Sequence, residues 1–393
     1  MNTRKTEKMT NSRLFNKGIL PVAVATAMFG AGVASAADFY LTNDATITDL
    51  TSSYNATTDY QVNQNATLST NSSMSVYYGT IDGQGGVATG RGGTVVIGGN
   101  LTMHGNIGAT NATGNFTISN GNTLTLASNV STFNSDNMTL NASSTLNLGN
   151  STTELQDTGY NRGSSDALVF SSNISMGSNS TINVGNGTTL NGNIYGTSSG
   201  QGTVNVLGNF TSTGSIGAAQ VDGADFITSK LEQINISKGN TFTLNNNATA
   251  TRMNINGTVT VAGNITAAVT MGASGVLNLN NGNTWGDNAA KVVGAIDGYD
   301  AQQGTLNING TFTTQGVIGG TYGLSAINLS NSTFTPGFTT TFAHNVNATT
   351  IKIGTNTMQT NATLQITAGG TSAGVNIAVT GNIIGGGNAT STD

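Results

Sequence analysis

The sequence predicts an all-β fold, a right-handed parallel β-helix (β-solenoid), on the basis of three observations. A sixteen-residue segment occurs three times without gaps, at residues 93–108, 202–217 and 304–319, reading GTVVIGGNLTMHGNIG, GTVNVLGNFTSTGSIG and GTLNINGTFTTQGVIG. Short apolar–polar–apolar triplets recur between Gly and Asn clusters, and two pairs of these triplets are separated by the same interval. Self-similarity at a regular offset indicates a stacked repeat architecture rather than one domain around a catalytic pocket.

The triplets are the predicted strands, because side chains that alternate between two faces give a period of two residues. Most have Thr before them, which strands favour, and the flanking Gly and Asn supply turns. No sustained 3.6-residue apolar stripe follows residue 37, so we expect essentially no helix there. The predicted strands are residues 124–126, 146–148, 182–184, 204–206, 259–261, 306–308 and 351–353.

The spacing of the strands distinguishes between β architectures. The interval from Leu124 to Leu146 equals the interval from Ile182 to Val204. A hairpin sheet would place the next strand about 8–12 residues on. An interval of roughly 20 residues instead fits one coil of a parallel β-helix, with three strands and three turns. Each repeat then spans about four or five coils, and Asn can stack on Asn one coil away and satisfy its amide there.

Residues 1–36 are predicted to be a secretory signal that is removed. Five basic residues precede an apolar run at residues 18–33, and a small-x-small cleavage site follows. The alternative is a membrane anchor, but this run of 16 residues falls short of the ~20 residues that span a bilayer. No later segment is a transmembrane helix candidate. The cleavage site consists of Ala34, Ser35 and Ala36, followed by Ala37.

Charge is sparse and acidic in this chain. Charged residues make up 7% of the 393 residues, and the net charge is −5; typical chains are roughly a quarter charged. Removal of residues 1–36 takes away five of twelve Lys/Arg and one of seventeen Asp/Glu, which leaves 7 cations against 16 anions, net −9. This excludes a nucleic-acid partner, which needs a basic surface. Cys is absent, which excludes disulfides and thiolate metal sites.

After the signal, the sequence divides into a segment without the repeat and three repeat units. Residues 37–80 are the predicted N-terminal capping segment, since terminal repeats usually differ. Residues 38–90 hold five of the nine tyrosines, so an aromatic contact patch is the alternative. The units are expected at residues 81–191, 192–293 and 294–393, without linkers and with the third incomplete. We expect an open sheet edge at residue 393 and a chain that is truncated or part of something longer.

The repeats resemble the passenger regions of autotransporter and surface-layer proteins, and are most similar to those of rickettsial surface cell antigens and outer-membrane adhesins. Those passengers carry similar G-[TS]-Φ-x-Φ-x-G-x-Φ-T-x-x-G-x-I-G-G stretches, followed by strings such as AINLSNSTFT, found here at residues 326–335. The resemblance covers most of residues 81–380 and implies a β-solenoid at a Gram-negative cell surface, in adhesion or a protein coat. The outer-membrane translocation barrel of that family is missing from this chain, and no catalytic residues carry over.

Two G-x-S-x-G stretches, at residues 196–200 and 370–374, match the nucleophile-elbow pattern. An elbow needs a strand-to-helix turn and a His base. No helix is expected, and His104 and His344 are the only histidines. Chance matches are expected in a chain this rich in Gly and Ser, so no catalytic residue is predicted.

His104 stands where the other two copies of the repeat have Thr213 and Gln315. A position that accepts three such different side chains is predicted to face solvent. Two histidines without an acidic cluster make a poor metal site. No metal and no cofactor are therefore predicted.

Polysaccharide-cleaving enzymes are the remaining catalytic class, since some of them are β-helices. They need paired carboxylates at defined separations. The densest acidic group is Asp222, Asp225 and Glu232, with Lys230 nearby. This group is more simply interpreted as a solvated loop with a weak surface ion pair.

The sequence therefore predicts a secreted or cell-surface β-solenoid that acts as an adhesin or surface-coat component without catalysis. It is expected to be exported through the inner membrane to the cell surface, the outer membrane or the extracellular space. The expected partners are a host-cell receptor or matrix protein, or copies of the chain itself. A self-assembling, S-layer-like structural protein is the alternative, and a polysaccharide-degrading enzyme is the minor one.

Overall fold

The structure, a computed structural model, describes most of the chain after the predicted signal. Ala34, Ser35 and Ala36 of the predicted cleavage site lie outside the described residues, and Ala37 opens the first strand. The described residues are 37–41, 45–47, 58–72, 75–84, 92–149, 167–217, 219–221, 225–227, 229–280, 292–313, 315–330, 338–354, 362–366 and 377–385.

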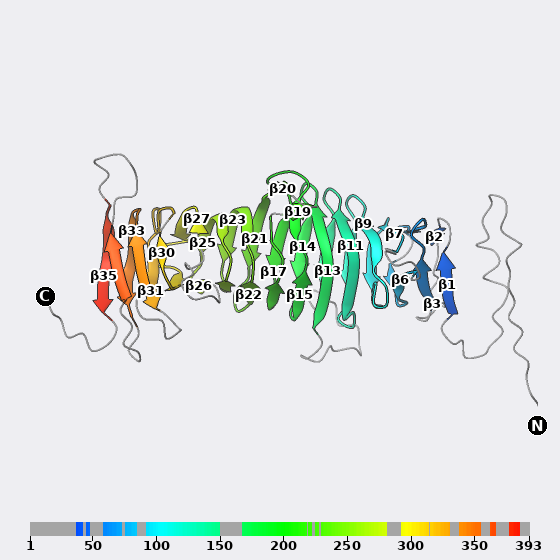
Figure 1. The fold of residues 1–393 in the computed structure, drawn as a ribbon, viewed down its shortest axis with the longest axis horizontal. Helices are drawn as coiled ribbons and strands as arrows, with labels where there is room; N and C mark the ends of the chain where they lie inside the picture. Colours follow the sequence, from blue (N-terminus) through cyan, green and yellow to red (C-terminus); the bar gives the residue numbers. More distant parts are fainter. Residues whose placement is uncertain are drawn as a thin grey trace, which may run out of the picture.

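The described residues form a parallel β-helix and contain no helix, so the predicted fold class is confirmed (Figure 1). Successive coils stack along the long axis of the molecule in chain order. Each coil contributes a strand, a bent half-strand or a single bridging residue to each of three faces. These pair in parallel with their counterparts one coil on. One antiparallel pair occurs among the described strands, the hairpin of β19 (Ala219–Val221) and β20 (Asp225–Ile227).

The three faces follow from the strand pairing. The first face holds β2 (Ala45–Ile47), β4 (Thr67–Thr70), β7 (Thr94–Ile97), β9 (Thr113–Ile118), β16 (Ile194–Gly196) and β27 (Val292–Val293). The second face holds β5 (Val76–Tyr77), β8 (Leu101–Met103), β10 (Thr123–Leu126), β12 (Thr145–Leu148), β14 (Thr181–Val184), β17 (Thr203–Val206), β21 (Leu231–Ile236) and β28 (Ile296–Gly298). The third face holds β1 (Ala37–Leu41), β3 (Thr58–Val62), β6 (Ile81–Gly83), β15 (Thr188–Asn191), β18 (Phe210–Ser212), β22 (Thr241–Leu244), β24 (Thr258–Val261), β26 (Val276–Asn280), β29 (Thr305–Asn309) and β31 (Leu324–Ser330).

Six longer strands bend around a corner and belong to two faces. They are β11 (Thr132–Leu140) and β13 (Leu168–Met176) on the third and first faces, β23 (Ala248–Ile255) and β25 (Ile265–Met271) on the first and second, and β33 (Val346–Ile353) and β35 (Val379–Gly385) on the second and third. A separate sheet of β30 (Phe312–Thr313), β32 (Phe338–Phe342) and β34 (Ala362–Ile366) takes the place of the first face toward the C-terminal end.

Like side chains stack on like side chains inside the coils. Phe133 and Phe170 are register partners whose ring centroids are 4.2 Å apart at 8°. Phe210 and Phe242 are partners at 5.1 Å and 7°. Such pairs contribute about 0.5–1.5 kcal/mol beyond the area they bury. Because a single coil cannot cover its own apolar side chains, this stability comes from its neighbours.

The predicted strands and their spacing are confirmed. All seven predicted triplets lie within strands, in β10, β12, β14, β17, β24, β29 and β33. Leu124 pairs with Leu146, and Ile182 pairs with Val204, so each of the two intervals does form one coil.

The length of a coil nevertheless varies along the stack. The register partners Thr125 and Asn147 are 22 residues apart. Thr260 and its partner Asn278 are 18 residues apart, whereas Asn147 and its partner Asn183 are 36 residues apart. The pairing of the strands continues across coils of unequal length, and residues 150–166 of this 36-residue coil lie outside the described residues.

Each sixteen-residue segment forms one complete coil, but the three copies begin on different faces. The first copy begins on the first face with β7, the second on the second face with β17, and the third on the third face with β29. Four whole coils and one further face separate consecutive copies, so the expected four or five coils per repeat are confirmed. The three pairs of bent strands also move on by one face from each pair to the next. Each pair carries one register shift, which follows Asn134, Thr249 and Asn347 respectively.

The described strands within residues 37–80 belong to the same superhelix as the repeats. The β1 strand pairs with β3, and β3 pairs with β6. Tyr77 on β5 is 3% exposed, and its ring centroid lies 5.9 Å from that of Tyr60. Burial, with smaller contributions from Tyr60 and Asp59, raises the pKa of Tyr77 well above its ordinary value. These two tyrosines therefore pack the interior, whereas Tyr78 is 45% exposed.

The Tyr77→Phe variant should lose less stability in alkali than the wild type. The folded pKa of Tyr77 lies above the ordinary value of about 10, so the unfolded chain releases this proton first as the pH rises. The free energy of unfolding of the wild type must then fall above about pH 10. Urea denaturation between about pH 9 and pH 11 measures this slope. An equally steep slope in Tyr77→Phe would contradict the prediction.

Glycine is required where the second and third copies begin. Gly202 and Gly304 both have a positive φ of 85°. A Cβ on Gly202 would lie 2.7 Å from the Cβ of Met176, and one on Gly304 would clash with Met271. Gly200 also has a positive φ, of 82°, but no atom lies within 4 Å of its added Cβ. Close packing on the buried Met176 therefore distinguishes Gly202 from Gly200.

We expect Gly202→Ala to destabilise the fold more than Gly200→Ala. Both variants place a Cβ in the left-handed conformation, which costs roughly 1–2 kcal/mol. Only Gly202→Ala also overpacks the interior, which typically costs about another 1–3 kcal/mol. Urea denaturation of the two variants gives the difference. Equal losses would mean that Met176 moves aside without cost, and the packing explanation would be wrong.

Candidate binding surface

The first asparagine ladder is a row of half-buried amides on the second face, formed by Asn147, Asn183, Asn205, Asn235 and Asn254. Each Nδ2 donates to the Oδ1 of the preceding member, at 2.8, 2.9, 2.8 and 2.8 Å along the row. At its N-terminal end the row stops at Thr125, whose Oγ1 accepts from Asn147 at 3.0 Å. These side chains alternate with buried apolar residues, so the ladder faces outward. The expected stacking of Asn on Asn is confirmed.

The second asparagine ladder lies on the third face and consists of Asn278, Asn307 and Asn328. Asn278 donates to Thr260 Oγ1 at 3.3 Å, Asn307 to Asn278 at 2.7 Å, and Asn328 to Asn307 at 2.8 Å. Both ladders donate toward the N-terminal end. Aligned hydrogen bonds polarise one another, so the Oδ1 of the last amide in each row is a strengthened acceptor.

Other asparagines close the corners between faces. Each accepts through Oδ1 from a backbone N–H of the next coil: Asn106 from Thr132 (3.1 Å), Asn193 from Ser215 (2.8 Å), Asn247 from Asn264 (2.8 Å) and Asn345 from Ala378 (3.0 Å). Backbone N–H groups at a turn need such partners, because a buried group left unpaired is costly. The abundance of Asn thus serves the corners as well as the ladders.

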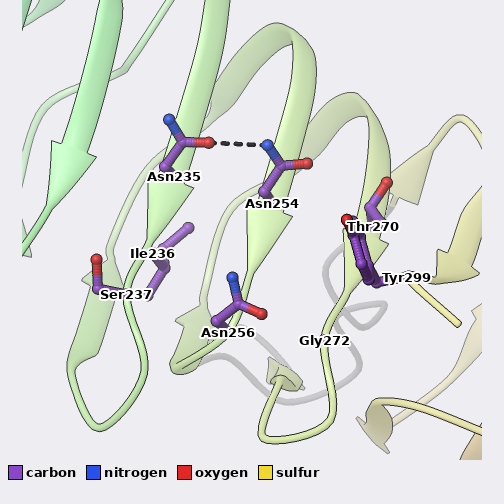
Figure 2. Close-up of a pocket in the computed structure, with 8 residues that line it drawn as sticks. All are labelled: Asn235, Ile236, Ser237, Asn254, Asn256, Thr270, Gly272 and Tyr299. Atoms are coloured by element: carbon purple, nitrogen blue, oxygen red, sulfur yellow. Dashed lines mark hydrogen bonds between the residues drawn. The ribbon is translucent and has the colours of Figure 1, made fainter.

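A shallow hollow of about 260 Å³ lies at the C-terminal end of the first asparagine ladder, beside Asn254 (Figure 2). In the strand register, Asn254 pairs with Thr270 of the next coil. A shorter side chain therefore stands where the next amide of the ladder would be. Asn235 and Asn254 lie on one side of the hollow, and Tyr299 lies beside Thr270 on the other. The lining residues are Asn235, Ile236, Ser237, Asn254, Asn256, Thr270, Gly272 and Tyr299.

Backbone hydrogen bonds fix the turns around this hollow. Tyr299 is 75% exposed, and its backbone N donates to Met271 O at 2.7 Å. Gly272 N donates to Ile255 O at 2.9 Å. A Cβ on Gly272 would clash with the Asn256 amide, so glycine lets that amide lie against the backbone. The hollow thus presents an aromatic ring, amides and hydroxyls, and its lining residues in the described part of the chain carry no charge.

The structure places the nucleophile-elbow candidates away from any elbow geometry. Gly196 ends β16 and residues 197–200 lie between β16 and β17, so the turn joins a strand to a strand and not to a helix. Residues 370–374 lie outside the described residues. His104, at the end of β8, and His344, before β33, belong to coils toward opposite ends of the stack. Neither histidine lies beside Ser198, the serine of the G-x-S-x-G pattern, in the strand pairing.

The position of His104 faces outward, as predicted. His104 is half-buried, and its counterparts Thr213 and Gln315 are exposed. The ring of His104 stacks on Tyr78 with centroids 4.5 Å apart at 17°. Its Nδ1 lies 3.2 Å from Asn129 Oδ1.

The acidic group is only partly covered by the described residues. Asp222 lies outside them, and Asp225 lies on β20 of the hairpin. Glu232 is half-buried on β21, Lys230 is exposed, and no ion pair joins these two described residues. Nowhere in the described part of the chain do three or more His, Cys, Asp or Glu side chains gather as a metal site would need.

The hollow around Tyr299 was not predicted. The one sequence signal is that Tyr299 directly follows the Ile-Asp-Gly flank of the third copy, at residues 296–298. Its meeting with Asn254 depends on the lengths of the two intervening coils.

Comparison of the chain with protein-family models, curated proteins and solved structures finds no match. Within the described residues, no helix is long and apolar enough to cross a membrane.

The Asn205→Ala variant should lose more stability than Asn254→Ala. Asn205 bonds to both Asn183 and Asn235, whereas Asn254 ends the row and bonds only to Asn235. At about 0.5–1.5 kcal/mol per hydrogen bond, we expect a loss of about 1–3 kcal/mol for Asn205→Ala and about half of that for Asn254→Ala. Urea denaturation tests the order. A larger loss in Asn254→Ala would contradict a ladder of equivalent bonds.

Proposed function

We propose that this chain is a secreted or cell-surface β-solenoid passenger that acts as an adhesin or surface-coat component without catalysis. The observation that supports this most is the outer surface itself. Two asparagine ladders run along an elongated stack, and exposed aromatic rings stand on turns, as Tyr299 and Tyr322 do. Rigid scaffolds with binding groups on turns are a common arrangement for recognition.

The sparse charge of the chain bears on how it meets a partner. Charged residues are 7% of the chain, so long-range electrostatic steering contributes little to association. Contact has to come from neutral hydrogen bonding and aromatic surface. A host-cell receptor or a matrix protein is the proposed partner, and the proposed location is the outer surface of the cell.

Self-assembly is the second candidate function. On β35, Ile383 and Ile384 are 53% and 49% exposed, and Ile366 on β34 is 50% exposed. Apolar side chains that are exposed on strands can pack against another copy of the chain. This observation favours end-to-end association of copies of the chain.

Adhesion and sedimentation assays on the purified chain separate the two candidates. We expect beads that carry the chain to adhere to host cells or to matrix-coated wells well above beads that carry an unrelated β-rich protein. Sedimentation in the same buffer should then give a monomer. Failure of the beads to adhere to either surface would contradict an adhesin. Sheets or filaments formed without a partner would favour assembly, and Ile383→Asn combined with Ile384→Asn should abolish them.

A further inference from the structure

We propose that the hollow around Tyr299 binds one sugar ring of a neutral glycan, a ligand class that deepens the proposed adhesin function and rests on it. The hollow holds about 260 Å³. Sites that enclose drug-sized ligands measure about 300–1,000 Å³. A space of this size therefore suits one ring of a longer chain that runs on across the surface.

The ring of Tyr299 supplies an apolar platform. Tyr299 is 75% exposed, the largest exposure among the exposed large apolar side chains of the described residues. A tyrosine combines a flat apolar body with a polar tip, and it orders few torsions on binding. The apolar C–H face of a pyranose ring fits such a platform, while its hydroxyl groups point sideways toward the hollow.

The end of the first asparagine ladder supplies an acceptor. Asn254 donates to Asn235 at 2.8 Å, and among the described residues no side chain donates to Asn254 Oδ1, because Thr270 takes the place of the next amide. The ladder behind Asn254 consists of four aligned amide–amide bonds, which strengthen this terminal acceptor. A hydroxyl donor of the ligand is the matching group.

The remaining lining groups determine which ligand charge the hollow favours. Ser237 and Thr270 offer hydroxyls, and Asn256 offers an amide held against Gly272. None of the described residues that line the hollow is a lysine, arginine, aspartate or glutamate. An ionised ligand would lose hydration there without gaining a counter-charge. The lining therefore favours uncharged hydroxyl-rich rings over uronic or sialic acids.

Binding to an array of immobilised neutral and acidic oligosaccharides tests the site. We expect the wild-type chain to bind neutral hexose or N-acetylhexosamine oligomers. Tyr299→Ala should weaken this binding at least about tenfold, equivalent to about 1.4 kcal/mol, whereas Tyr299→Phe should keep it. Tyr78→Ala removes another exposed tyrosine on a distant coil and should leave binding unchanged. Because Tyr299 is exposed, the unfolding midpoint of Tyr299→Ala should match the wild type.

Three outcomes would overturn the site: no neutral oligosaccharide binds, Tyr299→Ala binds as well as the wild type, or Tyr78→Ala loses as much as Tyr299→Ala. The bead assay separates this failure from failure of the adhesin function. Beads that adhere although no neutral oligosaccharide binds, or although Tyr299→Ala binds oligosaccharides as well as the wild type, would leave the adhesin standing and remove the sugar site. Oligosaccharide binding that depends on Tyr299, without any adhesion of beads to cells or matrix, would support the sugar site and contradict the adhesin function.

Discussion

Parallel pairing of each coil with the next, in register, is the constraint on which the rest of the molecule depends. It places Phe133 over Phe170 in the interior and Asn183 over Asn147 outside. A single coil loses more conformational entropy than its own contacts return, so the pairing supplies both cohesion and order. The same rule explains why a chain without Cys needs no covalent staple. Its hydrogen bonds and ring stacks recur from coil to coil.

Much of this architecture could be predicted because the signals are local and repeated. Alternation at residues 124–126 and 146–148 specifies two strands, and the interval between Leu124 and Leu146 specifies one coil. The ladder contact follows where the interval holds, since Asn205 then has to meet Asn183 one coil away. Surface exposure at His104 followed from the variety of side chains at equivalent positions.

The hollow could not be predicted in the same way, because it depends on sums over several coils. Asn254 pairs with Thr270, and Thr270 pairs with Asp297, across two coils of unequal length. Only the strand register of these two coils brings Tyr299 to the end of the first asparagine ladder. The rotation of the repeats has the same origin. Coils as different as 18 and 36 residues carry no uniform count from which a register could be read.

The one-face rotation between copies has a consequence for how the molecule meets its surroundings. Turns at equivalent positions of the three copies project in three directions around the axis, rather than along one flank. A rod with its related loops on one flank would have a front and a back, and would dock in one orientation only. In this chain the equivalent turns face three directions, so a similar contact is available to a partner that approaches from any side.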